Sequence, residues 1–169
     1  MNWSIVSSEN VEGNFLHVTL AAQQVTLSPQ KYKSLPFILQ VGIYEYFFLP
    51  NKASVTGASV RGLQGCKTLN KDPDPKNPVE GKEERDVVTF PGFVDCVYLD
   101  APGELQLDNG LGDVITIKNT NWSDAVLWNP HLTMESCYKD FVCVENAKIG
   151  KVQLEPKQSW TALQQLSLA

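Results

Sequence analysis

Short apolar stretches separated by turn residues dominate the chain from Asp86 onward. They are rich in β-branched residues and recur about every 8–12 residues, a spacing typical of sandwiches and barrels. Leu105 and Leu107 alternate with polar residues before Asn109-Gly110, and a second apolar stretch, Val114 to Ile117, follows. An Asn-Gly pair between such stretches favours a β-hairpin. No stretch has the length and period of a three-turn helix, so the sequence predicts an all-β domain.

Size and charge narrow the class of protein. With 169 residues, 43% of them hydrophobic, the chain can build one domain over residues 1–169 with its own core. The net charge of -5 and the presence of only two arginines, Arg61 and Arg85, argue against nucleic-acid binding, which needs a basic face. No apolar run approaches the roughly 20 residues of a membrane span, so we expect no transmembrane segment. The four cysteines lack Cys-x-x-Cys spacing and are predicted to be free thiols.

Earlier segments carry weaker patterns. Phe15 to Leu20 and Leu35 to Leu49 are interpreted as strands. Lys71 to Asp86 contains three prolines, many charges and almost nothing apolar, which predicts a solvated loop. That loop is either a plain surface excursion or a segment that docks a partner or covers a site.

Glu145 is the first candidate for chemistry, because it closes the otherwise apolar stretch Phe141 to Val144. Period two places Val142 and Val144 on one face of a strand and Glu145 on the other. If that second face lines a concave sheet, Glu145 is a candidate general base. The alternative is a carboxylate at a strand end that lies in water.

Three further residues are candidates for binding a sugar. Asp95 could accept hydrogen bonds from hydroxyl groups, and Trp128 could stack on a sugar ring, although a strand-edge Asp and a core Trp are common. His131 follows Asn129-Pro130 and could lie at the rim of a site. The other histidine, His17, is interpreted as structural. No catalytic triad, metal-ligand cluster or phosphate-binding glycine loop is present, so we expect no metal and no cofactor.

Six short motifs follow one another over roughly residues 55–162. They are Gly62-Leu63-Gln64-Gly65, Asp95-Cys96-Val97-Tyr98, Val126-Leu127-Trp128-Asn129-Pro130, Cys143-Val144-Glu145, Leu154-Glu155-Pro156 and Ser159-Trp160. In order and spacing this series resembles the C-terminal part of glucose-6-phosphate 1-epimerases, hexose-phosphate mutarotases of the galactose-mutarotase-like superfamily.

The resemblance implies an antiparallel β-sandwich with a sugar site on its concave face, apparently shortened at the N-terminus. In that family a Glu removes the proton of the anomeric hydroxyl and a His protonates the ring oxygen. Glu145 matches the Glu, and Asp95 matches a substrate-binding acid. The family's His has no counterpart in the matching stretch Tyr44 to Phe48, and an Arg that commonly follows the Asp is here Cys96. The family's phosphate-binding arginines also have no counterpart.

Three stretches, residues 69–75, 88–95 and 118–123, carry a narrower resemblance. They are similar to a plant branch of the superfamily, the mutarotase-like subunit of subcomplex B of the chloroplast photosynthetic NDH complex. This resemblance implies a structural role in cyclic electron flow around photosystem I, other NDH subunits as partners, and a peripheral place on the stromal side of the thylakoid membrane. The start of the chain has no transit peptide pattern, which leaves a cytoplasmic location as the alternative.

Three hypotheses follow. The first is a catalytically impaired mutarotase-fold protein that serves as an interaction subunit. The second is a working hexose-6-phosphate 1-epimerase acting on glucose 6-phosphate, with Glu145 as base and His131 as acid. The third is a module that binds a hexose phosphate through Asp95 and Trp128 without turnover.

Overall fold

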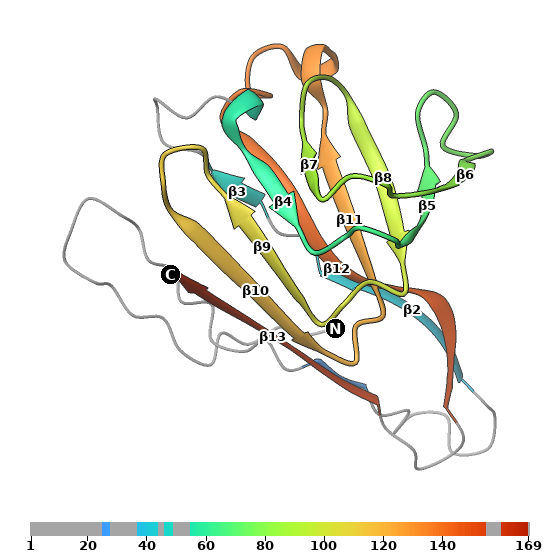
Figure 1. The fold of residues 1–169 in the computed structure, drawn as a ribbon. Coiled ribbons are helices and arrows are strands. Elements are labelled where there is room, and N and C mark those ends of the chain that lie inside the picture. The colour runs from blue at the N-terminus through green and yellow to red at the C-terminus, as the bar shows by residue number, and fades with distance from the viewer. Residues whose placement is uncertain (1–24, 28–36, 44–45, 49–54, 155–159, 169) are drawn as a thin grey trace.

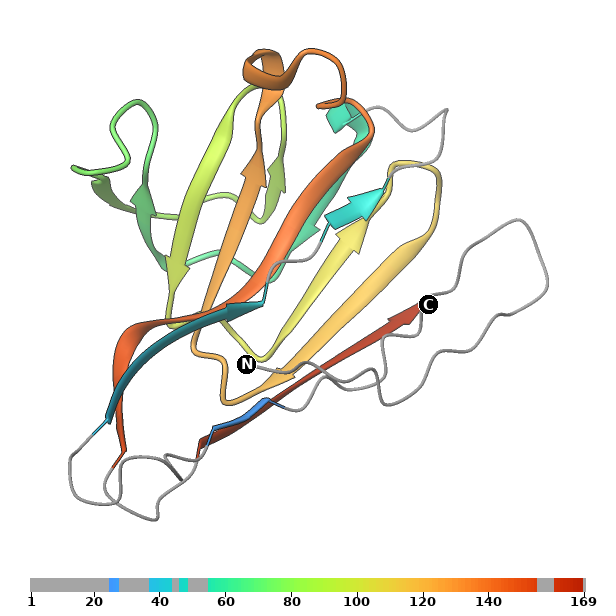
Figure 2. The same cartoon turned by 180° about the vertical axis from the view of Figure 1, so that it is seen from behind.

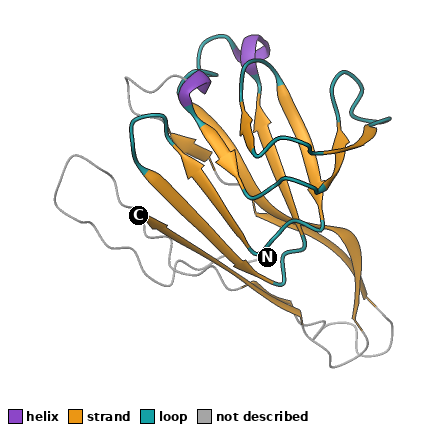
Figure 3. Ribbon diagram, viewed as in Figure 1, coloured by secondary structure: helices purple, strands orange, loops and turns teal. Residues whose placement is uncertain are grey.

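Two antiparallel sheets packed face to face form the described part of the protein (Figures 1 and 3). The computed structural model describes residues 25–27, 37–43, 46–48, 55–154 and 160–168. The six-stranded sheet has the order β1 (Val25–Leu27), β13 (Trp160–Leu168), β10 (Val114–Thr120), β9 (Glu104–Asp108), β4 (Ser59–Arg61) and β7 (Val87–Thr89).

The second sheet is seven-stranded and carries the residues singled out above. Its order is β2 (Phe37–Ile43), β12 (Phe141–Leu154), β11 (Asp124–Asn129), β8 (Val94–Leu99), β5 (Lys67–Asn70) and β6 (Val79–Lys82), and β3 (Tyr46–Phe48) also pairs with β12. Two 3-10 turns, η1 (Val55–Gly57) and η2 (His131–Met134), are the helical elements of the described residues. The all-β antiparallel sandwich predicted from the sequence is confirmed. In the described residues, no helix is long and apolar enough to span a membrane.

Most predicted strands appear where expected. The hairpin is β9–β10, and the stretch of residues 35–49 contains β2 and β3. The strand predicted at residues 15–20, with His17, lies outside the described residues. The prediction that residues 71–86 form only a loop is wrong, because residues 79–82 form β6 and pair with β5. The segment is nevertheless mostly exposed, as its polar composition predicted.

The core between the sheets is built from the inward-facing positions of both layers. Alternation along β9 buries Leu105 and Leu107 and leaves their neighbours exposed, which is the period of a strand with one face on a core. From the opposite sheet, β11 and β12 contribute alternate side chains to the same cluster. Its largest fully buried members are Tyr98, Phe90, Leu63, Leu105, Leu107, Ile117 and Leu127. Seen from behind in Figure 2, β12 runs between β2 and β11 along most of the second layer.

The turn between β9 and β10 packs against η1. The last residue pair of the β9–β10 ladder is Asp108 with Val114, so five residues connect the two strands rather than an isolated Asn-Gly pair. Asn109 organises the turn: Oδ1 accepts from the N–H groups of Leu111 and Asp113, at 2.8 and 3.2 Å. Gly110 has a φ of +76° and lies against Gly57 of η1, so close that a Cβ on Gly110 would be 2.6 Å from the Gly57 carbonyl oxygen.

We predict that Gly110→Ala destabilises the protein more than Gly112→Ala does. Both glycines have positive φ, so alanine at either position costs about 1–2 kcal/mol of backbone strain. At Gly112 nothing lies within 4 Å of the added Cβ, whereas at Gly110 the η1 backbone must move. Urea unfolding of the two variants should therefore separate them by at least about 1 kcal/mol, within the usual range for strained positions. Equal losses would show that the Gly57 contact contributes nothing.

Candidate functional site

Strand β12 has two faces with different surroundings. Val142 and Val144 belong to the core between the sheets, as the alternation predicted. Side chains of a strand alternate, so Cys143 and Glu145 lie on the opposite face, away from the six-stranded sheet. A separate apolar cluster on that face contains Val97, Val126 and Ala147, with Leu69 and Leu99 packed against it.

The register of the strands sets the neighbours of Glu145. Val126 of β11 pairs with Glu145, and Val97 of β8 pairs with Val126. One row along, Cys143 pairs with Trp128, which pairs with Asp95. Directly paired residues of antiparallel strands share a face, so Glu145, Trp128 and Asp95 lie on one face of the seven-stranded sheet. We call it the Glu145 face. Asp95 and Glu145 are two strands apart, about 10 Å in the hydrogen-bonding direction.

Burial controls the acidity of Glu145. Its side chain is 7% exposed and adjoins the apolar Val126 and Ala147. Loss of hydration disfavours the carboxylate and raises the pKa of Glu145 to about 7, while the positive charge of Lys71 lowers it and the negative charge of Asp95 raises it. A carboxyl group with this pKa is divided between its acid and its base form near neutral pH, which suits proton transfer.

Lys71 is the residue of this face that the sequence analysis missed. Its backbone N–H donates to the Asp95 carbonyl at 2.8 Å, which extends the β5–β8 ladder by one residue. Its Nζ lies 3.2 Å from Asp95 Oδ1, and both side chains are half-buried. The polar composition of residues 71–86 predicts that Lys71 lies in a solvated loop. The signal was available, because Lys71 stands two residues after the partly buried Leu69 and therefore shares its face.

Trp128 gives the face an aromatic surface. Its ring is half-buried, and its centroid lies 5.8 Å from that of Phe141 at an interplanar angle of 36°. Both side chains project from the Glu145 face, since Phe141 is two residues before Cys143 on β12. The face therefore combines an apolar aromatic ring with two carboxyl groups that can accept hydrogen bonds.

His131 lies away from Glu145. It follows the end of β11, and the strand from Val126 to Asn129 alone covers about 10 Å. The His131 ring packs on Tyr138 with a centroid distance of 4.8 Å, and its backbone N–H donates to Asn129 Oδ1 at 2.9 Å. The structure thus brings Glu145, Asp95 and Trp128 together but places His131 at the end of the sheet. No group of three or more His, Cys, Asp or Glu among the described residues could hold a metal ion.

Comparison with known proteins identifies the fold of this chain. A protein from Cenchrus ciliaris named "Putative glucose-6-phosphate 1-epimerase" is 27% identical over 135 residues, covering 74% of this chain and 39% of that protein. The solved structure of a "putative mutarotase (YeaD)" from Salmonella typhimurium superposes with a TM-score of 0.70 at 22% identity, over 88% of this chain and 50% of that one.

A galactose mutarotase-like protein from Lactobacillus casei superposes with a TM-score of 0.65 at 15% identity, over 88% of this chain and 58% of that one. No protein-family model matches the chain. The chain therefore spans between about two fifths and three fifths of the length of these proteins. At such identities the structural matches establish the architecture, and the fold of this chain is the galactose-mutarotase-like β-sandwich.

We predict that the stability of Glu145→Gln relative to wild type is higher at alkaline pH than at acidic pH. The folded pKa of about 7 exceeds the ordinary value of 4.5, so between them the folded protein holds a proton that the unfolded chain releases. This contribution is complete below about pH 4 and is lost as the pH rises through about 7. Glutamine cannot ionise, so the stability difference between variant and wild type should grow by about 3 kcal/mol between pH 4.5 and pH 8.

Urea unfolding at both pH values measures this difference. Glu104→Gln is the matched control, because Glu104 is exposed and pairs with Lys118 on the surface at 3.2 Å. The account fails if the two variants show the same dependence on pH.

Proposed function

We propose that this protein is a catalytically impaired mutarotase-fold protein whose Glu145 face binds a hexose or hexose phosphate and whose main role is structural, as an interaction subunit. The observation that carries the proposal is the separation of His131 from Glu145. Mutarotation needs a base at the anomeric hydroxyl and an acid at the ring oxygen, and loss of a general acid typically costs 10²–10⁴-fold in rate. Glu145 can serve as the base, but His131 packs on Tyr138 at the end of β11.

The other polar groups of the face favour binding over proton transfer. Asp95 is held by Lys71 at 3.2 Å and can accept hydrogen bonds from sugar hydroxyls in that fixed position. Lys71 keeps N–H donors for an oxygen of the ligand, because an ammonium has three. Trp128 offers an apolar ring to the C–H face of a sugar.

For the assembly, we propose the chloroplast photosynthetic NDH complex, with the protein bound peripherally on the stromal side of the thylakoid membrane. The support is the resemblance of residues 69–75, 88–95 and 118–123 to the mutarotase-like subunit of its subcomplex B. Outside those stretches, β6 (Val79–Lys82) is an exposed feature suited to contact, because it is the edge strand of its sheet and its Val79 is 60% exposed. An edge strand offers free backbone groups to a partner.

Blue-native gels of thylakoid membranes test this assignment. We expect the tagged protein to co-migrate with a high-mass NDH assembly, and Val79→Glu on the β6 edge to weaken that co-migration. Leu111→Glu is the control, because Leu111 is also an exposed apolar residue but lies in the β9–β10 turn. Recovery of the wild-type protein solely as a free monomer would contradict the assembly role.

A second candidate, a working hexose-6-phosphate 1-epimerase, is favoured by the pKa of Glu145 near 7. Exchange between the anomers of glucose 6-phosphate can be followed by NMR with equimolar wild type, Glu145→Gln and Glu104→Gln. The impaired-site proposal predicts a rate only slightly above buffer that falls to the buffer rate in Glu145→Gln and is unchanged in Glu104→Gln. A rate more than 10²-fold above buffer and dependent on Glu145 would establish the epimerase instead.

A further inference from the structure

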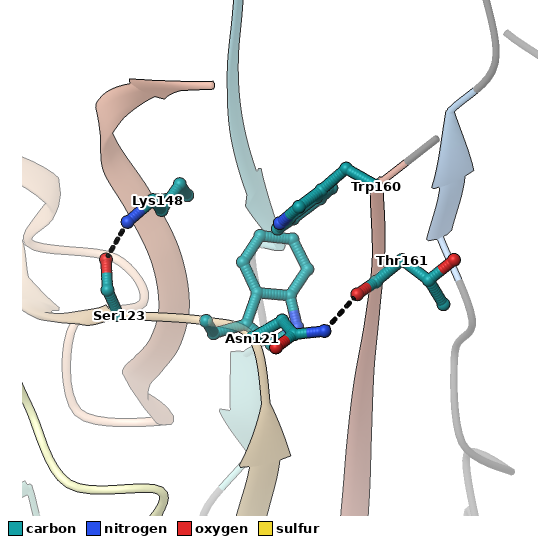
Figure 4. Close-up of a pocket in the computed structure, with 6 residues that line it drawn as sticks. Asn121, Ser123, Lys148, Trp160 and Thr161 are labelled. Atoms are coloured by element: carbon teal, nitrogen blue, oxygen red, sulfur yellow. Dashed lines mark hydrogen bonds between the residues drawn. The ribbon is translucent and has the colours of Figure 1, made fainter. Parts of the chain in front are cut away.

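A pocket of about 460 Å³ lies between β12, β13 and the connection from β10 to β11 (Figure 4). We call it the Trp122 pocket. Lys148 lines it from β12, and because side chains of a strand alternate, Lys148 projects from the opposite face of β12 to Glu145. The Trp122 and Trp160 rings meet edge to face, with centroids 5.2 Å apart and an interplanar angle of 87°. Figure 4 shows the Trp160 indole extending from β13 and Lys148 directed at Ser123. The residues that line the Trp122 pocket are Asn121, Trp122, Ser123, Lys148, Trp160 and Thr161.

A buried polar atom without a partner lies in the wall of this pocket, and others lie deeper between the sheets. Trp122 is 3% exposed, and its Nε1 has no hydrogen-bond partner. Asn146 is 1% exposed and lies on the inward face of β12, two residues before Lys148. Gln164 is 3% exposed and lies on the inward face of β13, two residues after Ala162. Asn146 Nδ2 and both polar atoms of the Gln164 amide also lack partners. Buried polar groups in folded proteins are nearly always paired, so the free Trp122 Nε1 donor in the pocket wall favours a polar ligand there.

Lys148 supplies a positive charge at the same place. Its Nζ donates to Ser123 Oγ at 3.0 Å, and Ser123 Oγ donates in turn to Asp124 Oδ2 at 2.8 Å. Asp124 is fully engaged, since it also accepts from the N–H groups of Asp100 and Ile149. Of the carboxylates in the described residues, none lies within 4.0 Å of Lys148 Nζ. Two of the three ammonium donors are therefore available to a ligand.

We propose that the Trp122 pocket binds a small hydroxylated anion of monosaccharide size, a sugar phosphate or a sugar acid, independently of the Glu145 face. The volume lies within the range of small-molecule sites. The anionic group pairs with Lys148, the hydroxyls take the free Trp122 Nε1 donor, and the indole of Trp160 packs on the sugar C–H groups. The two sites lie on opposite faces of β12, so they can be occupied at the same time.

Tryptophan fluorescence tests the proposal directly. Titrations use the Trp128→Phe background, which removes the tryptophan of the Glu145 face, with glucose 6-phosphate, gluconate, glucose and inorganic phosphate as probes. We expect saturable changes with one or both of the sugar anions and at least tenfold weaker binding of glucose and of inorganic phosphate. A response to glucose 6-phosphate alone identifies a sugar phosphate, and a response to gluconate alone identifies a sugar acid.

Variants then locate the site. Lys148→Met should weaken binding of the sugar anion at least tenfold, and Trp122→Phe, which removes only the indole donor and some ring area, should weaken it severalfold. Lys118→Met on the exposed face of β10 is the matched control and should change nothing, and neither should Glu145→Gln. Circular dichroism confirms folding, and should Lys148→Met fail to fold, Lys148→Gln replaces it. The proposal would be overturned if neither glucose 6-phosphate nor gluconate bound saturably. It would also be overturned if binding depended on Glu145 and not on Lys148.

Discussion

The alternation of side chains along β12 is the constraint on which the rest of the structure depends. Val142 and Val144 enter the core between the sheets, while Cys143 and Glu145 face the other way. Because the period is two, a slip of one residue against β11 would force Glu145 into the apolar core and expel both valines. Burial on both faces makes that slip costly, so the strand that holds the fold together also fixes the position of the candidate base.

The two carboxyl groups of the Glu145 face interact differently with the one positive charge near them, that of Lys71. Lys71 contacts Asp95 directly, which keeps that carboxylate paired, and acts on Glu145 only through space. Burial then dominates at Glu145 and raises its pKa to about 7. Two carboxyl groups in unlike environments take unlike roles, one as a fixed hydrogen-bond acceptor and one as a group that can exchange protons. The same sheet carries a second polar region on its opposite face around Trp122 and Lys148, so β12 separates two chemically distinct surfaces.

Much of the fold was predictable from local pattern, because strands that are buried on one face reveal their period. The alternation of Leu105 and Leu107, the Asn-Gly turn and the position of Glu145 all depend on neighbours in sequence. β6 escaped prediction because its four residues are exposed and are held only by pairing with β5. Lys71 escaped because its role is set by Asp95, which lies on another strand. The Trp122 pocket depends on contacts between the β10–β11 connection, β12 and β13, which are distant in sequence, and no local pattern records such contacts.

The central claim is that Glu145 is a buried carboxyl group whose acidity is set by burial, Asp95 and Lys71. The most direct measurement is an NMR pH titration of the carbon-13-labelled Glu145 carboxyl group in wild type and in Lys71→Met. The account predicts a midpoint pH of about 7 in wild type and a higher midpoint in Lys71→Met, because that variant removes the charge that lowers the pKa. A midpoint near the ordinary value of 4.5, unchanged by the variant, would contradict it.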